Sequence, residues 1–288
     1  MMENESTHGS SDSTPYLKRG TYWTYDQVFV KSAKIMNHLN KSGQAGVFGV
    51  QLHAKNTPTA NLKVLKIMLH SIQIFLPKDV NMNIILTGFE PFNGSTTNPS
   101  AEVIKNFPVD SFSGHNLILE ILPVDREKAV AWLRKSIQET HPEIIILLGE
   151  ATNRPVVSIE KVAINWMDFR IADNSGIQVR DQAVVGDGPA AFFSTLPVNL
   201  IYSQLKTAQI PAEISLSAGA YLCNQVFYSS LYYLSLAENK SLCGFIHLPS
   251  LPEQVVEKNL NAPSMSLDTS LKAITIALQT CIQKYPEQ

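Results

Sequence analysis

The stretch IIILL at residues 144–148 contains five consecutive apolar side chains and no polar one. Strands of a parallel sheet have this composition, because helices cover both of their faces. Just before this stretch, residues 126–140 place Ala129, Leu133 and Ile137 close to one helical face. A helix that leads into a doubly buried strand is typical of α/β proteins, so this region predicts a parallel sheet.

Other short apolar runs extend the pattern through the remainder of the chain. Strands are predicted at residues 83–87, 116–121, 144–148, 156–164, 213–217 and 243–247. Helices are predicted at residues 100–106, 126–140, 189–208, 222–237 and 267–284. Because right-handed crossovers place helices on both sides of such a sheet, we expect one α/β domain over residues 82–288, with a mostly parallel twisted sheet between two helical layers.

The first 81 residues differ from this domain in composition. They carry 9 Lys and Arg against 5 Asp and Glu, whereas residues 82–288 carry 14 against 20. They begin with a Ser/Thr-rich tail and contain helix candidates at residues 25–40 and 60–75. We interpret residues 1–81 as an N-terminal extension, partly disordered or helical, that precedes the α/β domain.

The overall composition excludes several classes of protein. Hydrophobic residues make up 44% and charged residues 17% of the 288-residue chain, as in soluble globular proteins. With a formal net charge of -2 and no long Lys/Arg run, the chain lacks the basic surface expected of a nucleic-acid or anionic-membrane binder. We therefore expect no nucleic-acid or membrane partner.

Targeting and cofactor motifs are also missing from the sequence. The polar start does not have the basic and then apolar order of a signal peptide, and the apolar stretch at residues 64–76 is too short to span a bilayer. Neither GxGxxG nor GxxxxGK[ST] occurs, and no metal-ligand spacing is found. These features predict a cytoplasmic protein without a cofactor or a bound metal.

The three cysteines, Cys223, Cys243 and Cys281, include no CxxC pair, which favours a reducing compartment. Cys223 follows a predicted strand and begins a predicted helix, where the helix dipole favours thiolate over thiol. It is therefore the candidate nucleophile, although a small buried apolar role is the alternative. Cys243, in a strand candidate, and Cys281, in the last helix, are interpreted as structural residues.

A cysteine nucleophile needs a histidine base and a group that orients the imidazole. His247 ends an apolar strand candidate, at the edge of the sheet where Cys223 is expected, whereas His115 and His141 lie in polar loops. Glu160 lies within an apolar run, where a buried carboxylate requires a partner. Glu160 could instead point to solvent from an edge strand, and His247 could be structural.

The loop after the first strand of the domain, LTGFEPFNG at residues 86–94, holds two phenylalanines three positions apart. Phe89 and Phe92 do not fit a regular core stripe in this Gly/Pro-rich loop. They predict aromatic walls of a small-molecule pocket at the carboxyl end of the strand. The alternative is a local hydrophobic plug beneath the loop.

Taken together, these residues resemble pyroglutamyl-peptidase I, also called pyrrolidone-carboxylate peptidase, over residues 82 to about 285. The resemblance rests on several separated motifs in the family's order: LTGFEPF at 86–92, NPS at 98–100, IEKVAIN at 159–165, RIADN at 170–174, GPAA at 188–191, AGAYLCN at 218–224 and GFIHLP at 244–249. It implies an αβα sandwich whose sheet is mixed, so one antiparallel element is expected. It also implies a homo-oligomer, either a dimer or a tetramer.

The resemblance further implies the reaction and the residues that perform it. Family members are cysteine exopeptidases that hydrolyse an N-terminal pyroglutamyl residue from a peptide, and their Glu-Cys-His triad falls on Glu160, Cys223 and His247. Cys223 would form the acyl-enzyme, while His247 protonates the leaving amine and then activates water. The expected substrate pocket comprises Phe89, Phe92, Asn98, Glu150, Arg170 and Tyr221.

Several features depart from the family pattern, including Asn93 in place of a usual glycine and Tyr221 where some members have Phe. Glu150 stands where many bacterial members have glutamine, and a carboxylate accepts but cannot donate a hydrogen bond unless it is protonated. Residues 1–81 precede the usual start of the family. A non-catalytic pyroglutamyl-binding protein is therefore an alternative, and a purine-nucleoside-phosphorylase-like transferase is a second, since fold alone does not define function.

Overall fold

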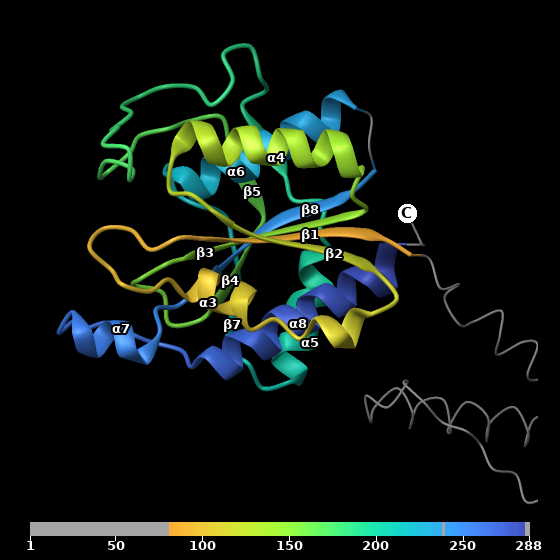
Figure 1. Ribbon diagram of the computed structural model, residues 1–288, viewed down its shortest axis with the longest axis vertical. Helices are drawn as coiled ribbons and strands as arrows, with labels where there is room; N and C mark the ends of the chain where they lie inside the picture. Colours follow the sequence, from red (N-terminus) through yellow and green to blue (C-terminus); the bar gives the residue numbers. More distant parts are fainter. Residues whose placement is uncertain (1–80, 238–239, 286–288) are drawn as a thin grey trace, which may run out of the picture. The chain divides into compact units, whose positions relative to one another are not determined.

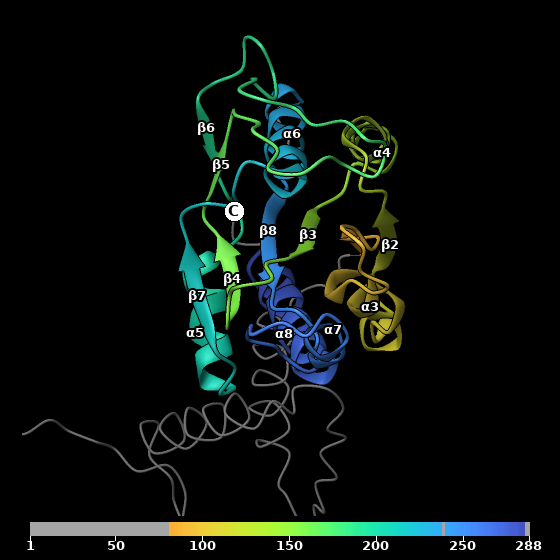
Figure 2. The ribbon, with the colours of Figure 1, turned by 90° about the vertical axis from the view of Figure 1, so that its left-hand side faces the viewer.

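The computed structural model describes residues 81–237 and 240–285 (Figure 1). Six strands form its main sheet: β1 (Asn83–Phe89), β2 (Asn116–Leu122), β3 (Ile144–Glu150), β4 (Val157–Glu160), β7 (Ala212–Ser215) and β8 (Leu242–Leu248). Their order is β2-β1-β3-β8-β4-β7, so β2 and β7 lie at opposite ends of the sheet (Figure 2). A second sheet pairs only β5 (Val162–Ile164) with β6 (Ala191–Phe193).

Helices cover both faces of the main sheet. They are α3 (Pro99–Lys105), α4 (Arg126–Thr140), α5 (Val198–Thr207), α6 (Leu222–Leu236), α7 (Pro252–Glu257) and α8 (Leu267–Lys284), with a short 3-10 helix at Val109–Phe112. α4 and α6 lie on one face, and α3, α5 and α8 lie on the other (Figure 1). The three-layer α/β architecture is therefore confirmed, whereas the proposed extension, with its helix candidates at residues 25–40 and 60–75, lies outside the described residues apart from Asn81.

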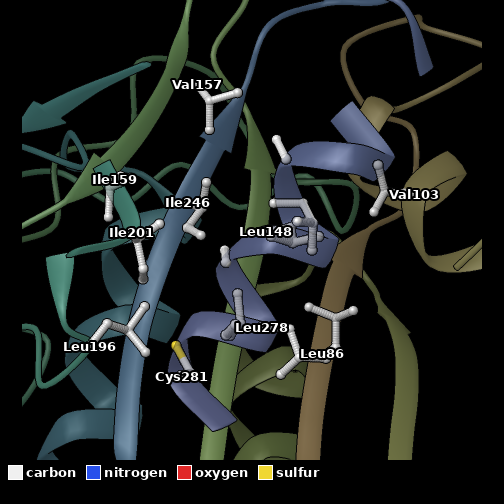
Figure 3. Close-up of a cluster of buried hydrophobic side chains, with 14 of the residues drawn as sticks. Leu86, Val103, Leu148, Val157, Ile159, Leu196, Ile201, Ile246, Leu278 and Cys281 are labelled. Atoms are coloured by element: carbon white, nitrogen blue, oxygen red, sulfur yellow. The ribbon is translucent and has the colours of Figure 1, made fainter. Parts of the chain in front are cut away.

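Alternation along the central strands divides the core between the two faces. Ile84 and Leu86 of β1 pack toward α3, α5 and α8, while Ile85 between them packs toward α4 and α6. Figure 3 shows the first of these clusters, to which Leu148 of β3 and Cys281 of α8 both belong. All of these side chains are buried, and each contributes about 1.5–3 kcal/mol when removed from water. None of the helices in the described ranges combines the length and apolarity needed to cross a bilayer.

The direction of two strands corrects the predicted sheet. β2, β1, β3 and β8 are parallel to one another, but β4 is antiparallel to β8, and β7 runs parallel to β4. Two strands therefore oppose the other four, where one antiparallel element was expected. Residues 151–156 explain the reversal at β4, because a connection this short cannot hold the crossover that parallel strands require.

The strand predicted at residues 156–164 is in fact two strands in different sheets. β4 ends at Glu160, and the backbone of Lys161 donates to Ser215 O at 2.7 Å and accepts from Ser194 N at 2.9 Å. After Lys161 the chain leaves β7 and β8 and pairs with β6 as β5. A continuous apolar run is compatible with either sheet, so its pattern does not reveal the change of partner.

The helix predicted at residues 189–208 begins nine residues late. Residues Ala191–Phe193 form β6, and α5 starts at Val198 directly after Pro197. Proline has no N–H and its ring clashes with the preceding turn, so a helix cannot run through Pro197 without losing a hydrogen bond. The prolines in this region were the signal for the later start.

The start of α3 passes very close to β1. A Cβ atom on Gly88 would lie 2.5 Å from the carbonyl oxygen of Ser100 and 3.0 Å from the backbone nitrogen of Ala101. These are backbone atoms of a helix whose N-cap is fixed by Asn98, so they cannot move aside as a flexible side chain would. Glycine at position 88 thus allows α3 to pack on β1 beneath the loop that follows this strand.

We predict that Gly88→Ala lowers the free energy of unfolding by about 1–3 kcal/mol, because the added methyl group overpacks this contact. Urea denaturation of the full chain measures the loss. Gly186→Ala is the matched control, since Gly186 is exposed and its Cβ would meet no atom within 4 Å; it should change stability by less than about 0.5 kcal/mol. Equal losses in both variants would contradict the packing argument.

Candidate active site

Glu160 and His247 meet on the face of the sheet that α4 and α6 cover. The antiparallel register pairs Glu160 of β4 with Phe245 of β8, and Ser158 with His247. Paired residues share a face, as do residues two apart on one strand, so Glu160 and His247 are diagonal neighbours. Glu160 Oε1 lies 2.7 Å from His247 Nδ1, and the two residues are 0% and 5% exposed.

This contact defines which nitrogen of His247 is available for proton transfer. A carboxylate at Nδ1 favours the tautomer with the proton on Nδ1 and stabilises the imidazolium ion. Nε2 is then left to take a proton from, or return it to, a third group. His247 is also held by Phe245, whose ring centroid is 4.7 Å from that of the imidazole.

Cys223 is the second residue of α6, and the start of this helix has no side-chain cap. The N-cap residue Tyr221 makes no capping hydrogen bond with its side chain, whereas Asp125 caps α4 through both Glu127 N and Lys128 N. The first backbone N–H groups of α6 are therefore not engaged by the N-cap side chain, and they carry the positive end of the helix dipole.

The start of α6 is nevertheless held firmly in place. The amide of Asn224 is fully buried; its oxygen accepts from Ile164 N at 2.9 Å, and its nitrogen donates to Ile164 O at 2.9 Å and to Trp166 O at 3.0 Å. These bonds attach the residue after Cys223 to the end of β5. The thiol is consequently presented from a fixed backbone.

Gly149 provides the surface on which the Cys223 thiol rests. In the parallel register of β3 and β8, Gly149 is the direct neighbour of His247. A Cβ atom on Gly149 would lie 3.0 Å from Cys223 Sγ and 2.7 Å from Phe245 Cζ. The sulfur therefore lies over bare backbone beside His247, which a larger residue at position 149 would prevent.

The surroundings of Cys223 disfavour an isolated thiolate. Burial of the sulfur, together with the nearby charge of the Glu160 carboxylate, raises the pKa of Cys223 to about 12. Since Cys223 and His247 flank the same glycine, a thiolate in this position requires that its proton pass to the imidazole, so that the sulfur is paired with a cation.

The other two cysteines belong to the hydrophobic core. Cys243 and Cys281 are completely buried free thiols, in the core clusters on opposite faces of the sheet. Burial raises the pKa of both thiols well above the usual range. Their positions agree with the structural interpretation, and they leave Cys223 as the partly exposed thiol.

A small cavity of about 20 Å³ adjoins the Cys223 thiol. Its lining includes five of the six residues expected in a substrate pocket and adds Val124 and Leu222; the complete set is Phe89, Phe92, Asn98, Val124, Glu150, Tyr221, Leu222 and Cys223. The rings of Phe92 and Tyr221 are 6.2 Å apart. A water molecule needs roughly 10–15 Å³ of such space, so a five-membered ring can enter only if these side chains move apart.

Asn98 uses its side-chain hydrogen bonds to stabilise the fold rather than to face the cavity. It is buried, its oxygen accepts from both the backbone and the hydroxyl of Ser100, and its nitrogen donates to Glu90 O at 3.2 Å. These bonds cap α3 and fix the end of the loop that connects β1 to α3. Asn98 therefore shapes the cavity wall that Phe89 and Phe92 complete.

Glu150 is the acidic side chain at the cavity, and it is held by donors from the segment after β8. Its Oε1 accepts from Ser250 Oγ at 2.6 Å, and its Oε2 accepts from Gln254 Nε2 at 3.2 Å. Gln254 also donates to Thr97 O, which links Glu150 to the residue preceding Asn98. The described residues include no group of three His, Cys, Asp or Glu side chains suited to hold a metal ion.

Arg170 is the one expected pocket residue that the structure does not bring to the cavity. Its side chain is exposed, and its carbonyl oxygen accepts from Gln178 Nε2 at 3.0 Å. The preceding residue, Phe169, is completely buried and packs edge-on against the ring of Tyr221. Arg170 lies at a bend directly after the buried Phe169 and is exposed to solvent.

Arg154 is a site residue that the sequence analysis missed. Its Nη1 donates to Glu160 Oε1 at 2.6 Å, so this oxygen is shared between Arg154 and His247. The signal for it was the apolar run around Glu160, which requires a cationic partner for a buried carboxylate. No local pattern indicated which cation that would be.

Comparison with known proteins places the chain among peptidases. A family profile for pyroglutamyl peptidase matches residues 82–284. The pyrrolidone-carboxylate peptidase of Treponema denticola is 42% identical over 205 residues, covering 70% of this chain and 94% of that protein. The corresponding protein of Fusobacterium nucleatum is 44% identical over 196 residues, covering 68% of this chain and 91% of that protein.

Solved structures agree with this result. The pyrrolidone carboxyl peptidase of Pyrococcus furiosus matches with a TM-score of 0.68 and 38% identity, over 71% of this chain and 100% of that chain. The enzyme of Thermococcus litoralis matches with a TM-score of 0.68 and 36% identity, over 72% and 96% of the two chains. The chain is accordingly a cysteine-type peptidase by descent, and it belongs to the pyroglutamyl peptidase family.

Proposed function

We propose that this chain hydrolyses the bond between an N-terminal pyroglutamyl residue and the remainder of a peptide, through an acyl-enzyme on Cys223. One observation carries the proposal: a thiol beside a carboxylate-oriented imidazole opens onto an aromatic-walled cavity. His247, held at Nδ1 by Glu160, stands beside the glycine on which the Cys223 sulfur rests. Nucleophile, base and orienting group are thus assembled at one point.

The proposed reaction has two stages. The Cys223 thiol gives its proton to His247, and the sulfur bonds to the carbonyl carbon that follows the ring. The C–N bond then breaks, and the amine leaves with the proton from His247. In the second stage water gives a proton to the same imidazole and its hydroxyl to the acyl carbon, which releases pyroglutamate and restores the thiol.

The first backbone N–H groups of α6, which the N-cap side chain does not engage, are available to stabilise the negative charge that develops in this reaction. As the sulfur attacks, the carbonyl oxygen becomes negative close to the first backbone N–H groups of the helix. Donors aimed at such an oxygen are each worth about 100- to 1,000-fold in rate. Because Asn224 anchors the adjacent backbone, these donors need no rearrangement during the reaction.

The cavity supports selection of a lactam over a charged N-terminus. A pyroglutamyl residue has no free α-amine, so recognition depends on shape, apolar contact and hydrogen bonds to the ring N–H and C=O. Phe92 and Tyr221 provide apolar walls, and Glu150 provides an acceptor for the ring N–H. Entry of the ring requires that the two aromatic side chains separate.

Location and assembly are part of the same proposal. We propose a cytoplasmic location, since all three cysteines are free thiols.

We also propose a homo-oligomer, because Phe193 and Leu216 are 68% and 73% exposed, and such side chains gain from burial in an interface. Sedimentation of the full chain measures the oligomeric state, and a monomer at all concentrations would contradict this assembly.

The direct test of function uses a fluorogenic pyroglutamyl arylamide, with the prolyl arylamide as control. We expect the full chain to release the amine from the pyroglutamyl compound only. Cys223→Ser and His247→Ala should each keep the native fold by circular dichroism, the second with lower stability because Glu160 loses a partner, and each should lose about 1,000-fold or more in kcat/KM. A near wild-type rate in either variant would overturn the assigned roles, and a folded but inactive wild-type chain would favour a binding protein.

A second prediction concerns the pH dependence that Glu150 imposes. The Glu150 carboxylate is one of the charges that raise the pKa of the Cys223 thiol, after burial and Glu160. Glu150→Gln removes this charge, so the thiolate should form more readily, and the ascending limb of kcat/KM should move to lower pH. We also expect KM to change by about 5- to 10-fold, as the acceptor for the ring N–H is altered.

The matched control for this prediction is Glu139→Gln, which removes the same charge from the outer surface of α4, where Glu139 is 3.9 Å from Lys135. Its pH profile and KM should equal those of the wild type. A shift of the Glu150→Gln profile toward higher pH would show that Glu150 does not act on the thiol through its charge.

A further inference from the structure

Arg154 binds the carboxylate that orients His247. Its Nη1 lies 2.6 Å from Glu160 Oε1, and the Arg154 side chain is 30% exposed while that of Glu160 is fully buried. The other oxygen, Oε2, has no hydrogen-bond partner within the described part of the chain. The position of the Glu160 carboxylate is therefore determined by two bonds to one oxygen, from Arg154 and His247.

The same guanidinium also binds the segment that leads to the nucleophile. Nη1 of Arg154 donates to Ser215 Oγ at 3.2 Å, and Nη2 donates to Ser217 O at 2.8 Å. Ser215 ends β7, and the following residues connect β7 to the start of α6. The fork geometry of the guanidinium, which offers several donors in one plane, thus ties the carboxylate of the triad to the connection before Cys223.

The charges around the Cys223 sulfur give Arg154 a second effect. The titratable or charged groups that face this sulfur or its partners are Glu160 from β4, Glu150 from β3, His247 from β8, Tyr221 from the start of α6 and Arg154 from the β3–β4 connection. Both carboxylates oppose a negative charge on sulfur, and Arg154 favours it. Among these five groups Arg154 is the permanent cation.

We propose that Arg154 is a positioning residue for the hydrolysis described above: it holds Glu160 against His247, and its charge permits Cys223 to ionise beside two carboxylates. This role rests on the proposed function of the triad. It requires both the charge and the fork of the side chain, because the charge acts on the sulfur and the fork joins Glu160 to Ser217.

The test separates these two requirements with Arg154→Met and Arg154→Lys in the full chain. Two readouts are needed: the pH dependence of Cys223 alkylation by iodoacetamide, which uses no substrate, and kcat and KM for the pyroglutamyl arylamide. Cys243 and Cys281 are fully buried, so alkylation of the folded chain reports on Cys223, and mass spectrometry verifies the site. Arg180→Met is the control, since it removes the same charge from an ion pair with Asp168 in which the Arg180 side chain is 62% exposed.

For Arg154→Met we expect alkylation at pH 7 to be about tenfold slower, with its midpoint at higher pH, because an opposite charge near the thiolate is lost. We expect kcat to fall by at least about tenfold while KM stays within about twofold. Arg154→Lys should restore the alkylation midpoint and leave kcat reduced, as one ammonium group cannot bond to Glu160 and to Ser217 O with the same geometry. Arg180→Met should match the wild type in both readouts.

A merely structural role would lower stability without moving the alkylation midpoint of the folded fraction. An unchanged midpoint in Arg154→Met would therefore overturn the proposal, and so would full kcat in Arg154→Lys together with a wild-type midpoint. If Arg154→Met does not fold, Arg154→Gln, which keeps a donor without the charge, decides the same point. Absence of hydrolysis by the wild-type chain would refute the proposed function, while the alkylation result would still test the effect of Arg154 on the thiol.

Discussion

A carboxylate with no exposed surface, Glu160, accepts hydrogen bonds from His247 and Arg154 at one oxygen. Removal of one partner from such a buried charged group typically costs about 3–5 kcal/mol, so both contacts constrain the fold around them. The first requires the antiparallel register of β4 and β8, which makes Glu160 and His247 diagonal neighbours. In the second, the same guanidinium also bonds to Ser217 O in the connection between β7 and α6.

The remainder of the site follows from this arrangement. Once His247 is fixed on β8, the neighbouring position on β3 must be bare to admit the Cys223 sulfur, and Gly149 meets that requirement. The start of α6 is anchored by Asn224 but lacks a side-chain cap, so the N-cap side chain does not engage its first backbone N–H groups. Core packing, strand register and helix capping thus converge on the geometry that acyl transfer needs.

Much of this could be predicted from local sequence. The helices at residues 126–140 and 267–284 were predicted with their observed bounds, because each has a continuous amphipathic pattern. Glu160, Cys223 and His247 could be selected because each combines a reactive group with an apolar strand or a helix start, and the structure brings them to one face of the sheet. The Gly/Pro-rich sequence at residues 86–94 predicted Phe89 and Phe92 as aromatic walls, and the family resemblance added Tyr221.

What could not be predicted depends on contacts between distant parts of the chain. The reversal of β4 arises from a short connection and a choice of partner, and the division of residues 156–164 between two sheets leaves the apolar pattern unchanged. Arg154 bonds not only to Glu160 but also to Ser217, which is 63 positions away in the sequence. Arg170 was assigned to the pocket by motif, but it is exposed to solvent directly after the buried Phe169.

The acyl group on Cys223 is the central claim of this account, and rapid-quench mass spectrometry tests it most directly. The full chain is mixed with the pyroglutamyl arylamide, quenched in acid during the first turnovers and digested. The account predicts one pyroglutamyl group on the peptide that contains Cys223, and none on Cys243 or Cys281 or after mixing with the prolyl compound. An acyl group on another residue, or a burst of amine release without any adduct on Cys223, would contradict it.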